Sequence, residues 1–409
     1  MKSINADFRT QSSKSKLKYS IILPVRNGSQ YLDHALKPLV AQTRSDFEVV
    51  IVINDTNEIA PYLLNLSKED KRFKIFINET VLQMSLNYEK ALSLASGEWI
   101  LLLGADDSIL DWFFNVSDAM ITRFPEQRLL RWRRAHYFWE NARGRYGYQV
   151  LNFAASKNIR IVNSKAPFFK SVFGFSTMFN MPQIYTCSLV HSDLISQIKE
   201  DGAGRIYQSI IPDIYSSIML MQETKSFVDL DIPLTLVGTS GSSMNLDSRI
   251  YREKELASNE HPTLNLHRSV PEKFHSLEIE SLYLIECMRQ SPCQYGWVIE
   301  LVLKYRVLYD LMRVRKKHNF SFVDIYRTSQ IEPIGLLASP LWFLLFFLTI
   351  RIGNYLNSLS YYMRYKFGKR KGQIFYESRD CEKFNTIDKA NIVLRDNFLV
   401  KITNWINNF

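Results

Sequence analysis

The sequence predicts an α/β fold with a mostly parallel sheet, helices on both faces of that sheet, and a helical C-terminal region. Four apolar runs alternate with helical patterns in the first 110 residues. They span residues 19–24, 47–54, 73–78 and 98–103. Continuous apolar runs of this length are typical of parallel strands that are buried on both faces. From about residue 270 the apolar spacing becomes helical, as in 278–288 and 297–313.

Polar side chains follow these strands at the points where the strands end. Asn27 follows the first strand, Asp55 follows the second, and Asp106 and Asp107 follow the fourth. The carboxyl ends of parallel strands meet at one edge of a sheet, and ligands bind outside that edge. We therefore expect a nucleotide site there.

Four segments carry a resemblance to a known family. They are Pro24-Val-Arg-Asn27, Val52-Ile-Asn-Asp55, Ser85-Leu-Asn87 with Ala95-Ser-Gly97-Glu98, and Leu103-Gly-Ala-Asp-Asp107. In this order they resemble the donor-binding half of an inverting family 2 glycosyltransferase with the GT-A fold, of the kind that assembles polysaccharides or O-antigens. The last segment resembles the family's Asp-X-Asp signature, with Gly104 where many members have another acid.

The resemblance implies a division of the chain. Residues 1–18 are expected to be a flexible leader. Residues 19–245 would form the GT-A domain, with a nucleotide-binding half at 19–110 and an acceptor half at 111–245. Residues 246–409 would form the helical region. Within the acceptor half, 141–185 fits no regular pattern, and a loop or flap over the cleft is expected there.

The resemblance also implies a cofactor and two substrates. The cofactor is Mg²⁺ or Mn²⁺, the donor is a UDP- or dTDP-sugar, and the acceptor is lipid-linked or a polysaccharide. Asp107 and Asp106 are the expected metal ligands, because such ions take carboxylate and phosphate oxygens. Asp107 could instead cap a following helix.

The nucleotide is expected to contact a set of residues at the strand ends. Asp55 can accept a hydrogen bond from the N3–H of uracil or thymine, although it also suits an Asx-turn. Arg26 could reach a phosphate or be a solvated loop charge, and Asn27 could instead only shape the turn. The complete expected set is Pro24, Arg26, Asn27, Asp55, Asn87 and Asp106.

Inversion requires a base that takes the proton of the acceptor hydroxyl. Asp213 is the candidate, because Ile211-Pro-Asp-Ile-Tyr215 resembles the family's base-bearing segment, and a helix expected over 206–220 is entered through Ile211-Pro-Asp213. It could also be a helix N-cap. Asp193 and Asp201 are weaker candidates, and His191 is interpreted as an ordinary polar residue. The Gly/Ser run 237–243 could contact phosphate or be a flexible loop.

The net charge of +10 suits an anionic membrane or a nucleic acid, but no nucleic-acid-binding motif accompanies it, so no nucleic-acid partner is expected. Residues 333–350 carry no charge, and an amphipathic stripe and a basic run to Lys371 follow. Segment 333–372 is therefore expected to associate with the membrane, or alternatively to be a buried helix. Four scattered cysteines and no apolar leader favour the cytoplasm, on the inner face of the plasma membrane.

Two other functions remain open from the sequence. A nucleotidyltransferase also combines a nucleotide-binding sheet with acidic metal ligands, but it usually has a Gly-rich basic loop after its first strand. A non-catalytic scaffold at the membrane would not need Asp55, Asp106, Asp107 and Asp213 together. The leading prediction is therefore an inverting, metal-dependent glycosyltransferase.

Overall fold

The computed structural model describes most of the chain outside the N-terminus and the segments around 242–278 and 330–372. The described residues are 17–26, 28–55, 61–142, 150–208, 211–241, 279–292, 295–329, 348, 352, 355, 359, 373–378 and 385–408. Most of the expected leader and nearly all of the expected membrane segment lie outside them.

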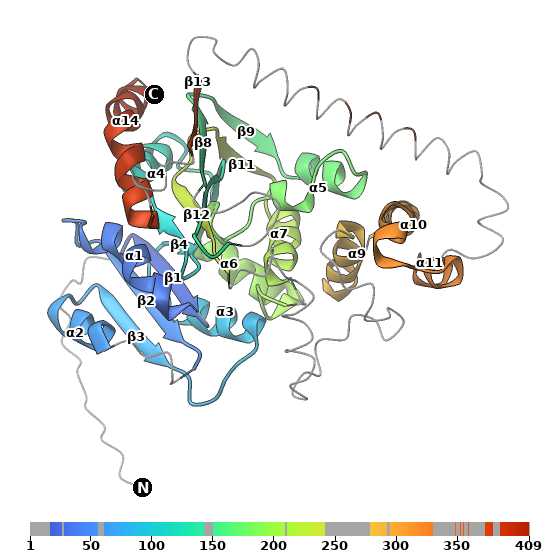
Figure 1. Cartoon of the computed structure of the whole chain (residues 1–409), viewed down its shortest axis with the longest axis horizontal. Helices are drawn as coiled ribbons and strands as arrows, with labels where there is room; N and C mark the ends of the chain where they lie inside the picture. The colour runs from blue at the N-terminus through green and yellow to red at the C-terminus, as the bar shows by residue number, and fades with distance from the viewer. Residues whose placement is uncertain are drawn as a thin grey trace, which may run out of the picture.

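The core is an eight-stranded sheet that is mostly parallel (Figure 1). Across the sheet the strands are β3 (Phe73–Ile77), β2 (Phe47–Ile53), β1 (Tyr19–Val25), β4 (Trp99–Leu102), β10 (Ser188–His191), β6 (Leu129–Trp132), β11 (Ser226–Leu230) and β9 (Ile159–Asn163). The first four are parallel, and β10 and β9 run against their neighbours. All four strands that the sequence predicts in the first 110 residues are present, and they pair in parallel as neighbours in the sheet.

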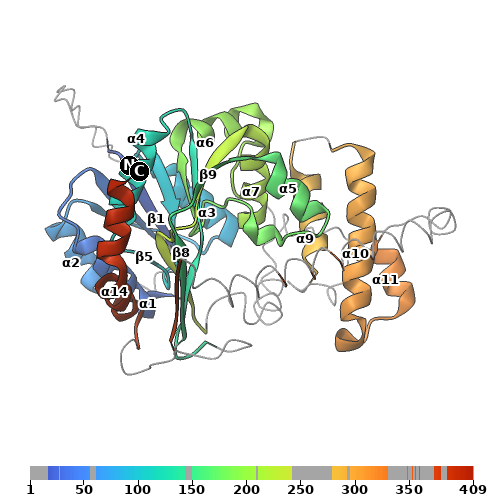
Figure 2. The ribbon, with the colours of Figure 1, turned by 90° about the horizontal axis from the view of Figure 1, so that it is seen from above.

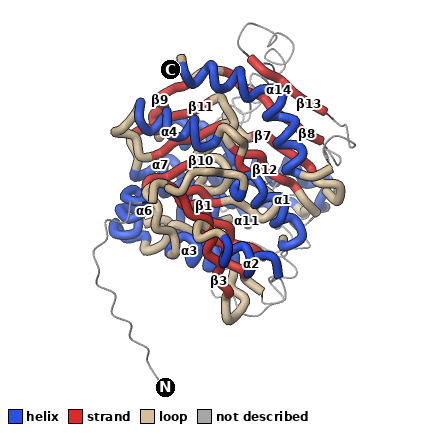
Figure 3. Tube along the Cα trace, turned by 90° about the vertical axis from the view of Figure 1, so that its left-hand side faces the viewer, coloured by secondary structure: helices blue, strands red, loops and turns tan. Residues whose placement is uncertain are grey.

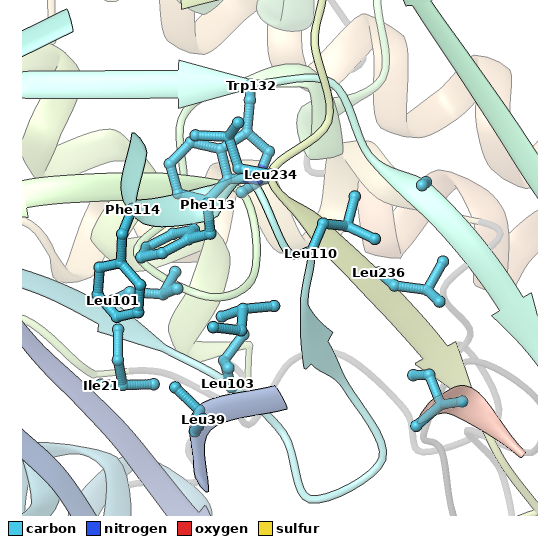
Figure 4. Close-up of a cluster of buried hydrophobic side chains, with 14 of the residues drawn as sticks. Ile21, Leu39, Leu101, Leu103, Leu110, Phe113, Phe114, Trp132, Leu234 and Leu236 are labelled. Atoms are coloured by element: carbon cyan, nitrogen blue, oxygen red, sulfur yellow. The ribbon is translucent and has the colours of Figure 1, made fainter. Parts of the chain in front are cut away.

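A second sheet of five strands packs beside the first. Its strands are β13 (Gln373–Ser378), β8 (Val150–Ser156), β7 (Ala135–Phe138), β12 (Thr235–Thr239) and β5 (Ser108–Ile109). Strand β5 begins directly after Asp107, and β12 pairs with it. Phe113 and Trp132 meet edge to face near Leu234 where the two sheets join (Figure 4), with ring centroids 5.9 Å apart.

Helices cover both faces of the large sheet, as predicted. One face carries α1 (Ser29–Val40), α2 (Pro61–Glu69) and α4 (Phe113–Arg123); the other carries α3 (Met84–Ser93), α5 (Lys165–Val172), α6 (Ser192–Ile198) and α7 (Pro212–Glu223). Side chains of a strand point alternately to opposite faces, so Ile21 and Leu23 pack with the first group while Ile22 packs with the second. A 3₁₀-turn, η2 (Met178–Asn180), and a π-turn, η3 (Lys199–Ala203), complete this half.

The C-terminal region is largely helical, as predicted. Helix α9 (Glu280–Gln290) packs on α7, α10 (Trp297–His318) packs on α9, and α11 (Phe322–Ser329) packs on α10 (Figure 2). The chain then returns to the sheets through β13 and α14 (Ile387–Asn407). Figure 3 shows α14 lying beside β13 and α1. No helix within the described part of the chain is both long enough and apolar enough to cross a membrane.

Three local expectations were wrong. Segment 141–185 is not a loop or flap in its described part, because it contains β8, β9, α5 and η2. Strand β13 lies in a region expected to be helical, and its pairing with β8 comes from a distant part of the chain. Helix α7 starts at Pro212 rather than at 206, because the backbone N–H groups of Ile206 and Tyr207 donate to Glu89 Oε2 instead.

Helix α14 is tied to the start of the second sheet by a buried amide. Asn391 Nδ2 donates to the Ile109 carbonyl oxygen over 3.0 Å and to Asp111 Oδ1 over 3.1 Å. Ile109 lies two residues after Asp107, so the C-terminal helix supports the turn that bears the acidic pair.

We expect Asn391→Ala to lower the free energy of unfolding by about 1–3 kcal/mol, because it removes two hydrogen bonds of a buried amide and leaves Ile109 O with only the Ser108 hydroxyl as a side-chain donor. Asn397→Ala is the matched control on the same helix. That exposed amide donates only to Val393 O, so its removal should change stability by less than about 0.5 kcal/mol. Urea denaturation of both variants measures the difference, and equal losses would contradict a special role for Asn391.

Candidate active site

The acidic pair sits in a tight turn after β4. The Asp107 backbone N–H donates to Gly104 O over 3.2 Å and closes the turn. The Asp107 side chain has no exposed surface. Its Oδ2 accepts the N–H of Gly104 over 2.7 Å, and its Oδ1 accepts the N–H of Gly238 over 2.8 Å. Burial, and then the charge of Asp106, raise the pKa of this carboxyl above its usual range.

Asp106 is the more accessible member of the pair. It is partly exposed, and its Oδ2 accepts hydrogen bonds from the Ser240 hydroxyl over 2.7 Å and from the Ser240 N–H over 3.2 Å. The indole N–H of Trp139 donates to the Asp106 backbone oxygen over 3.1 Å. The two carboxylates are therefore held in different ways: Asp107 is inside the fold, and Asp106 is partly exposed at the carboxyl edge of the sheet.

Two glycines allow this arrangement. A Cβ on Gly238 would lie 1.7 Å from the Asp106 carbonyl oxygen, so only glycine lets β12 approach the turn. A Cβ on Gly104 would lie 2.8 Å from Asp107 Oδ2, 2.9 Å from the Tyr185 hydroxyl and 3.0 Å from Asp106 Oδ1. Three oxygen atoms thus converge on the space that a side chain at position 104 would fill.

These contacts correct two sequence-based alternatives. Asp107 does not cap a helix, because β5 follows it and α4 begins only at Phe113. The Gly/Ser run 237–243 was expected to offer backbone N–H groups to phosphate or to be a flexible loop. In its described part, the N–H groups of Gly238 and Ser240 donate to the acidic pair instead.

The predicted nucleotide residues lie at the same edge of the sheet. Pro24 is buried in β1 opposite Val52, and pairing of β1 with β4 stops two residues earlier, at Ile22. Arg26 follows β1 and Asp55 follows β2, and both are partly exposed. Because β2 and β4 flank β1, Asp55 and Asp106 lie on either side of Arg26. Asn27 lies outside the described residues.

Asn87 belongs to a buried chain of amides that sequence reasoning did not detect. Asn78 Nδ2 donates over 2.8 Å to both Asn54 Oδ1 and Asn87 Oδ1. Asn54 also exchanges hydrogen bonds with the backbone of Leu82. The network joins the ends of β2 and β3 to the start of α3. The only available signal was an asparagine after each of two strands, which does not reveal their pairing.

Asp213 lies at the start of α7 with a carboxylate that the fold leaves unsatisfied. Its Oδ1 is buried and has no hydrogen-bond partner among the described residues. Ile211, not Asp213, occupies the N-cap position, so the capping alternative is wrong. Burial raises the pKa of Asp213 to about 7, although the charge of Arg134 acts in the opposite direction.

Tyr185 connects Asp213 with the acidic turn. It forms an isolated bridge with Leu102 of β4, and its hydroxyl is hydrogen-bonded to the Asp107 side chain. Burial raises the pKa of Tyr185, and the charges of Asp107, Asp106 and Asp213 act in the same direction. A single buried tyrosine is therefore within electrostatic reach of all three carboxylates. Its position depends on long-range packing, and sequence reasoning missed it.

The weaker base candidates are placed differently. The Asp193 side chain is 76% exposed and lies beside His191 Nδ1 at 3.6 Å. Asp201 is exposed in η3. His191 is an ordinary polar residue at the end of β10, as predicted: its Nδ1 accepts the Asp193 N–H and caps α6. Neither aspartate shares the buried surroundings of Asp213.

The fold is an α/β domain, and its acidic residues gather at the carboxyl edge of a mostly parallel sheet. Residues 20–122 match the family described as glycosyl transferase family 2. That segment is about a quarter of the chain and includes most of β1 and all of β2, β3 and β4, so the likeness to this family is shown for the first parallel strands.

Curated relatives each match about a quarter of the chain. The GalNAc(5)-diNAcBac-PP-undecaprenol beta-1,3-glucosyltransferase of Campylobacter jejuni is 33% identical over 95 residues, which are 23% of this chain and 31% of the relative. A PGL/p-HBAD biosynthesis glycosyltransferase of Mycobacterium bovis is 30% identical over 94 residues, 23% of this chain and 37% of the relative. The chain thus spans about a third of the length of these relatives.

Among solved structures, S. aureus TarS 1–349 in complex with UDP-GlcNAc is similar over 76% of this chain and 90% of that one. The two share 18% sequence identity, and the TM-score is 0.46.

We expect Gly238→Ala to lower the free energy of unfolding by about 1–3 kcal/mol, since the new methyl group must push β12 away from the acidic turn. Gly296→Ala is the control, because nothing lies within 4 Å of the position where its Cβ would be. Denaturant midpoints measure the change. A Gly238 variant as stable as the Gly296 variant would contradict the close contact between β12 and the turn.

Proposed function

We propose that this protein is an inverting, metal-dependent glycosyltransferase that moves a sugar from a UDP- or dTDP-sugar to a lipid-linked or polysaccharide acceptor. One observation carries the proposal most directly. Asp213 Oδ1 is buried without a hydrogen-bond partner among the described residues, and its carboxylate lies within electrostatic reach of the same tyrosine that is hydrogen-bonded to the acidic turn. Unsatisfied buried carboxylates are costly and are typical of catalytic sites.

The donor is proposed to bind along the carboxyl ends of β1, β2 and β4. Asp55 would accept the N3–H of the uracil or thymine ring, and Arg26 would face the phosphates, with Pro24 and Asn27 shaping the turn. Asn87 would act indirectly, because its amide chain fixes the loops on either side of the base.

The oxygen atoms around Gly104 fit a divalent ion of the Mg²⁺ or Mn²⁺ type. Such ions prefer one or two carboxylates together with phosphate oxygens and waters. Among the described residues no group of three or more His, Cys, Asp or Glu side chains is arranged to hold a metal. Asp106 would therefore be the principal protein ligand, with Asp107 behind it. When bound, the ion neutralises the negative charge that develops on the diphosphate.

Asp213 is proposed to act as the general base. The acceptor hydroxyl oxygen attacks the anomeric carbon as the bond from that carbon to the diphosphate oxygen breaks. The hydroxyl proton passes to Asp213, and the nucleoside diphosphate leaves. A pKa of about 7 suits this role, because a base is most effective when its pKa lies near the working pH. A direct displacement of this kind inverts the anomeric configuration.

A membrane is proposed to present the acceptor on its cytoplasmic side. The C. jejuni relative's name specifies a PP-undecaprenol substrate. In segment 333–372 the structure describes Leu348, Ile352, Tyr355 and Leu359, which are helical and between 41% and 67% exposed. Their spacing places them on one helix face. An exposed apolar stripe supports interfacial association over the alternative of a buried helix.

We expect Asp106→Asn to abolish metal-dependent UDP binding with little change in stability, because an amide oxygen can still accept the Ser240 hydrogen bonds. Asp107→Asn should instead lower the free energy of unfolding by about 1–3 kcal/mol, since its amide N–H₂ faces a backbone donor. Calorimetric titration with UDP and Mn²⁺, alongside denaturation, separates the two effects. Normal metal-dependent binding by Asp106→Asn would remove Asp106 from the site.

We expect Asp55→Ala to weaken UDP binding by about 1.5–3 kcal/mol, the usual value of a hydrogen bond to a charged group. Asp33→Ala, on the exposed side of α1 beside Lys37, is the control and should leave UDP affinity unchanged. If both variants bind UDP equally well, the base is recognised by other residues.

We expect Asp213→Asn to reduce turnover by about 10²–10⁴-fold while UDP and metal binding remain, because the base is needed only when the acceptor attacks. Wild-type turnover should rise with pH through about 7, the pKa of Asp213, as the carboxyl ionises. Loss of UDP binding by the variant would instead make Asp213 structural.

The same residue links stability to pH. The pKa of Asp213 is about 7 in the folded protein and 3.8 ordinarily, so between these values the folded state binds more protons than the unfolded state. Its contribution to stability therefore falls as pH rises through this window. Asp213→Asn should be more stable than wild type above pH 7 and equally stable below pH 3.8. Thermal unfolding at several pH values tests the sign.

A further inference from the structure

The turn between α10 and α11 exposes apolar side chains at the far end of the helical region. Phe322 and Val323 are each 58% exposed, and Met312 on the last turns of α10 is 42% exposed. We call residues 312–327 the α10–α11 tip. Figures 1 and 2 show these two helices at the opposite side of the molecule from α14.

The exposure of this pair is built into a well-ordered turn. Phe320 and Ile325 on either side are buried, at 3% and 1% exposure. The Ser321 hydroxyl donates to Asp324 Oδ2 over 2.6 Å and accepts the Asp324 N–H over 3.1 Å, which fixes the start of α11. The buried neighbours anchor the turn, so Phe322 and Val323 are not needed for the local core.

The apolar pair is surrounded by positive charge. The tip contains five lysine or arginine residues and a single carboxylate, that of Asp324. Arg313, Lys316 and Lys317 are exposed on α10, and the guanidinium carbon of Arg315 lies 3.8 Å from the centre of the Phe322 ring. Five cationic side chains against the one carboxylate of Asp324 make the tip as a whole cationic.

We propose that the α10–α11 tip docks on an anionic phospholipid surface, with Phe322 and Val323 among the acyl chains and the lysine and arginine side chains at the headgroups. Exposed apolar residues ringed by cations suit an anionic bilayer interface. The chain also passes from Ser329, the end of α11, into the uncharged segment 333–350 within a few residues. A purely electrostatic partner such as a nucleic acid would gain nothing from the exposed Phe322 and Val323.

The tip adds an orienting role to the proposed function and rests on it only for the identity of the acceptor. Helix α9 lies between α10 and α7, the helix whose first turn bears Asp213. Two separate contacts, the tip and the apolar stripe of 348–359, would fix how the site faces the bilayer. Either contact alone would leave the domain free to rotate on the surface.

The test is co-sedimentation of the full-length protein with vesicles of phosphatidylcholine, with and without about one third phosphatidylglycerol. Lys316→Glu with Lys317→Glu should weaken partition into the anionic vesicles about tenfold or more, since each basic residue near such a surface contributes roughly 1 kcal/mol. The matched control is Lys68→Glu on α2 with Lys71→Glu in the turn that follows it, which makes the same change in net charge at exposed positions far from the tip. Equal partition of the two double variants overturns the proposal.

A second measurement reports insertion directly. Phe322→Trp should be quenched by lipids that carry bromine on their acyl chains, whereas Val400→Trp, on an exposed position of α14, should not exceed the wild-type background. Ile352→Asp with Tyr355→Asp disrupts the apolar stripe, and the proposal predicts that quenching at position 322 survives in this background. Absence of extra quenching at 322 overturns the proposal.

UDP titration without vesicles tests the proposed donor site separately from the membrane docking of the tip. If the wild-type protein does not bind UDP, the proposed donor site is refuted, whatever the result for the tip.

Discussion

The hydrogen bond from the Gly238 N–H to Asp107 Oδ1 is the contact on which the rest of the site depends. Asp107 has no exposed surface, and a buried carboxylate is tolerated only where donors reach it. The Gly104 N–H of its own turn and the Tyr185 hydroxyl reach this carboxylate, and the Gly238 N–H reaches it from a different strand, β12. That strand can approach only because position 238 has no side chain. The acidic turn is therefore held in place by the second sheet as much as by the first.

This constraint explains why the end of the chain returns to the beginning. Strand β12 lies between β5 and β7, and the sheet continues through β8 to β13. Helix α14 then closes one face, with Phe398 stacked on Phe153 at 5.3 Å and Asp388 bonded to His34 of α1 at 2.8 Å. Residues separated by almost the whole sequence thus hold the acidic turn in place. The helices α9 to α11 come between β12 and β13 in the chain, and of these three α9 packs on α7, on the side away from α14.

The sequence was sufficient to predict the nucleotide half, because apolar strands and polar strand ends are local signals. The four strands, the two faces of helices and the position of Asp213 before α7 all follow from short segments. The partners of those residues were not predictable. The sequence around Asp107 does not indicate that its partner is Gly238, and the sequence around Asn87 does not indicate that its partner is Asn78. Tyr185 reaches the acidic turn only through the packing of the segment before β10. The hydrogen-bond partners of these buried polar groups are distant in the sequence and are brought together only by the fold. The residue types that need such partners can be recognised from the sequence.

The central claim is that the acidic turn and Asp213 face one reaction from two sides. A crystal structure with UDP and Mn²⁺ tests it most directly. The account predicts that the Asp106 carboxylate would hold the ion, whose charge would neutralise the diphosphate. It also predicts the uracil at Asp55 and the Asp213 carboxylate facing the position of the transferred sugar. An ion held away from residues 104–107, or a diphosphate that places the sugar on the side opposite Asp213, would contradict it.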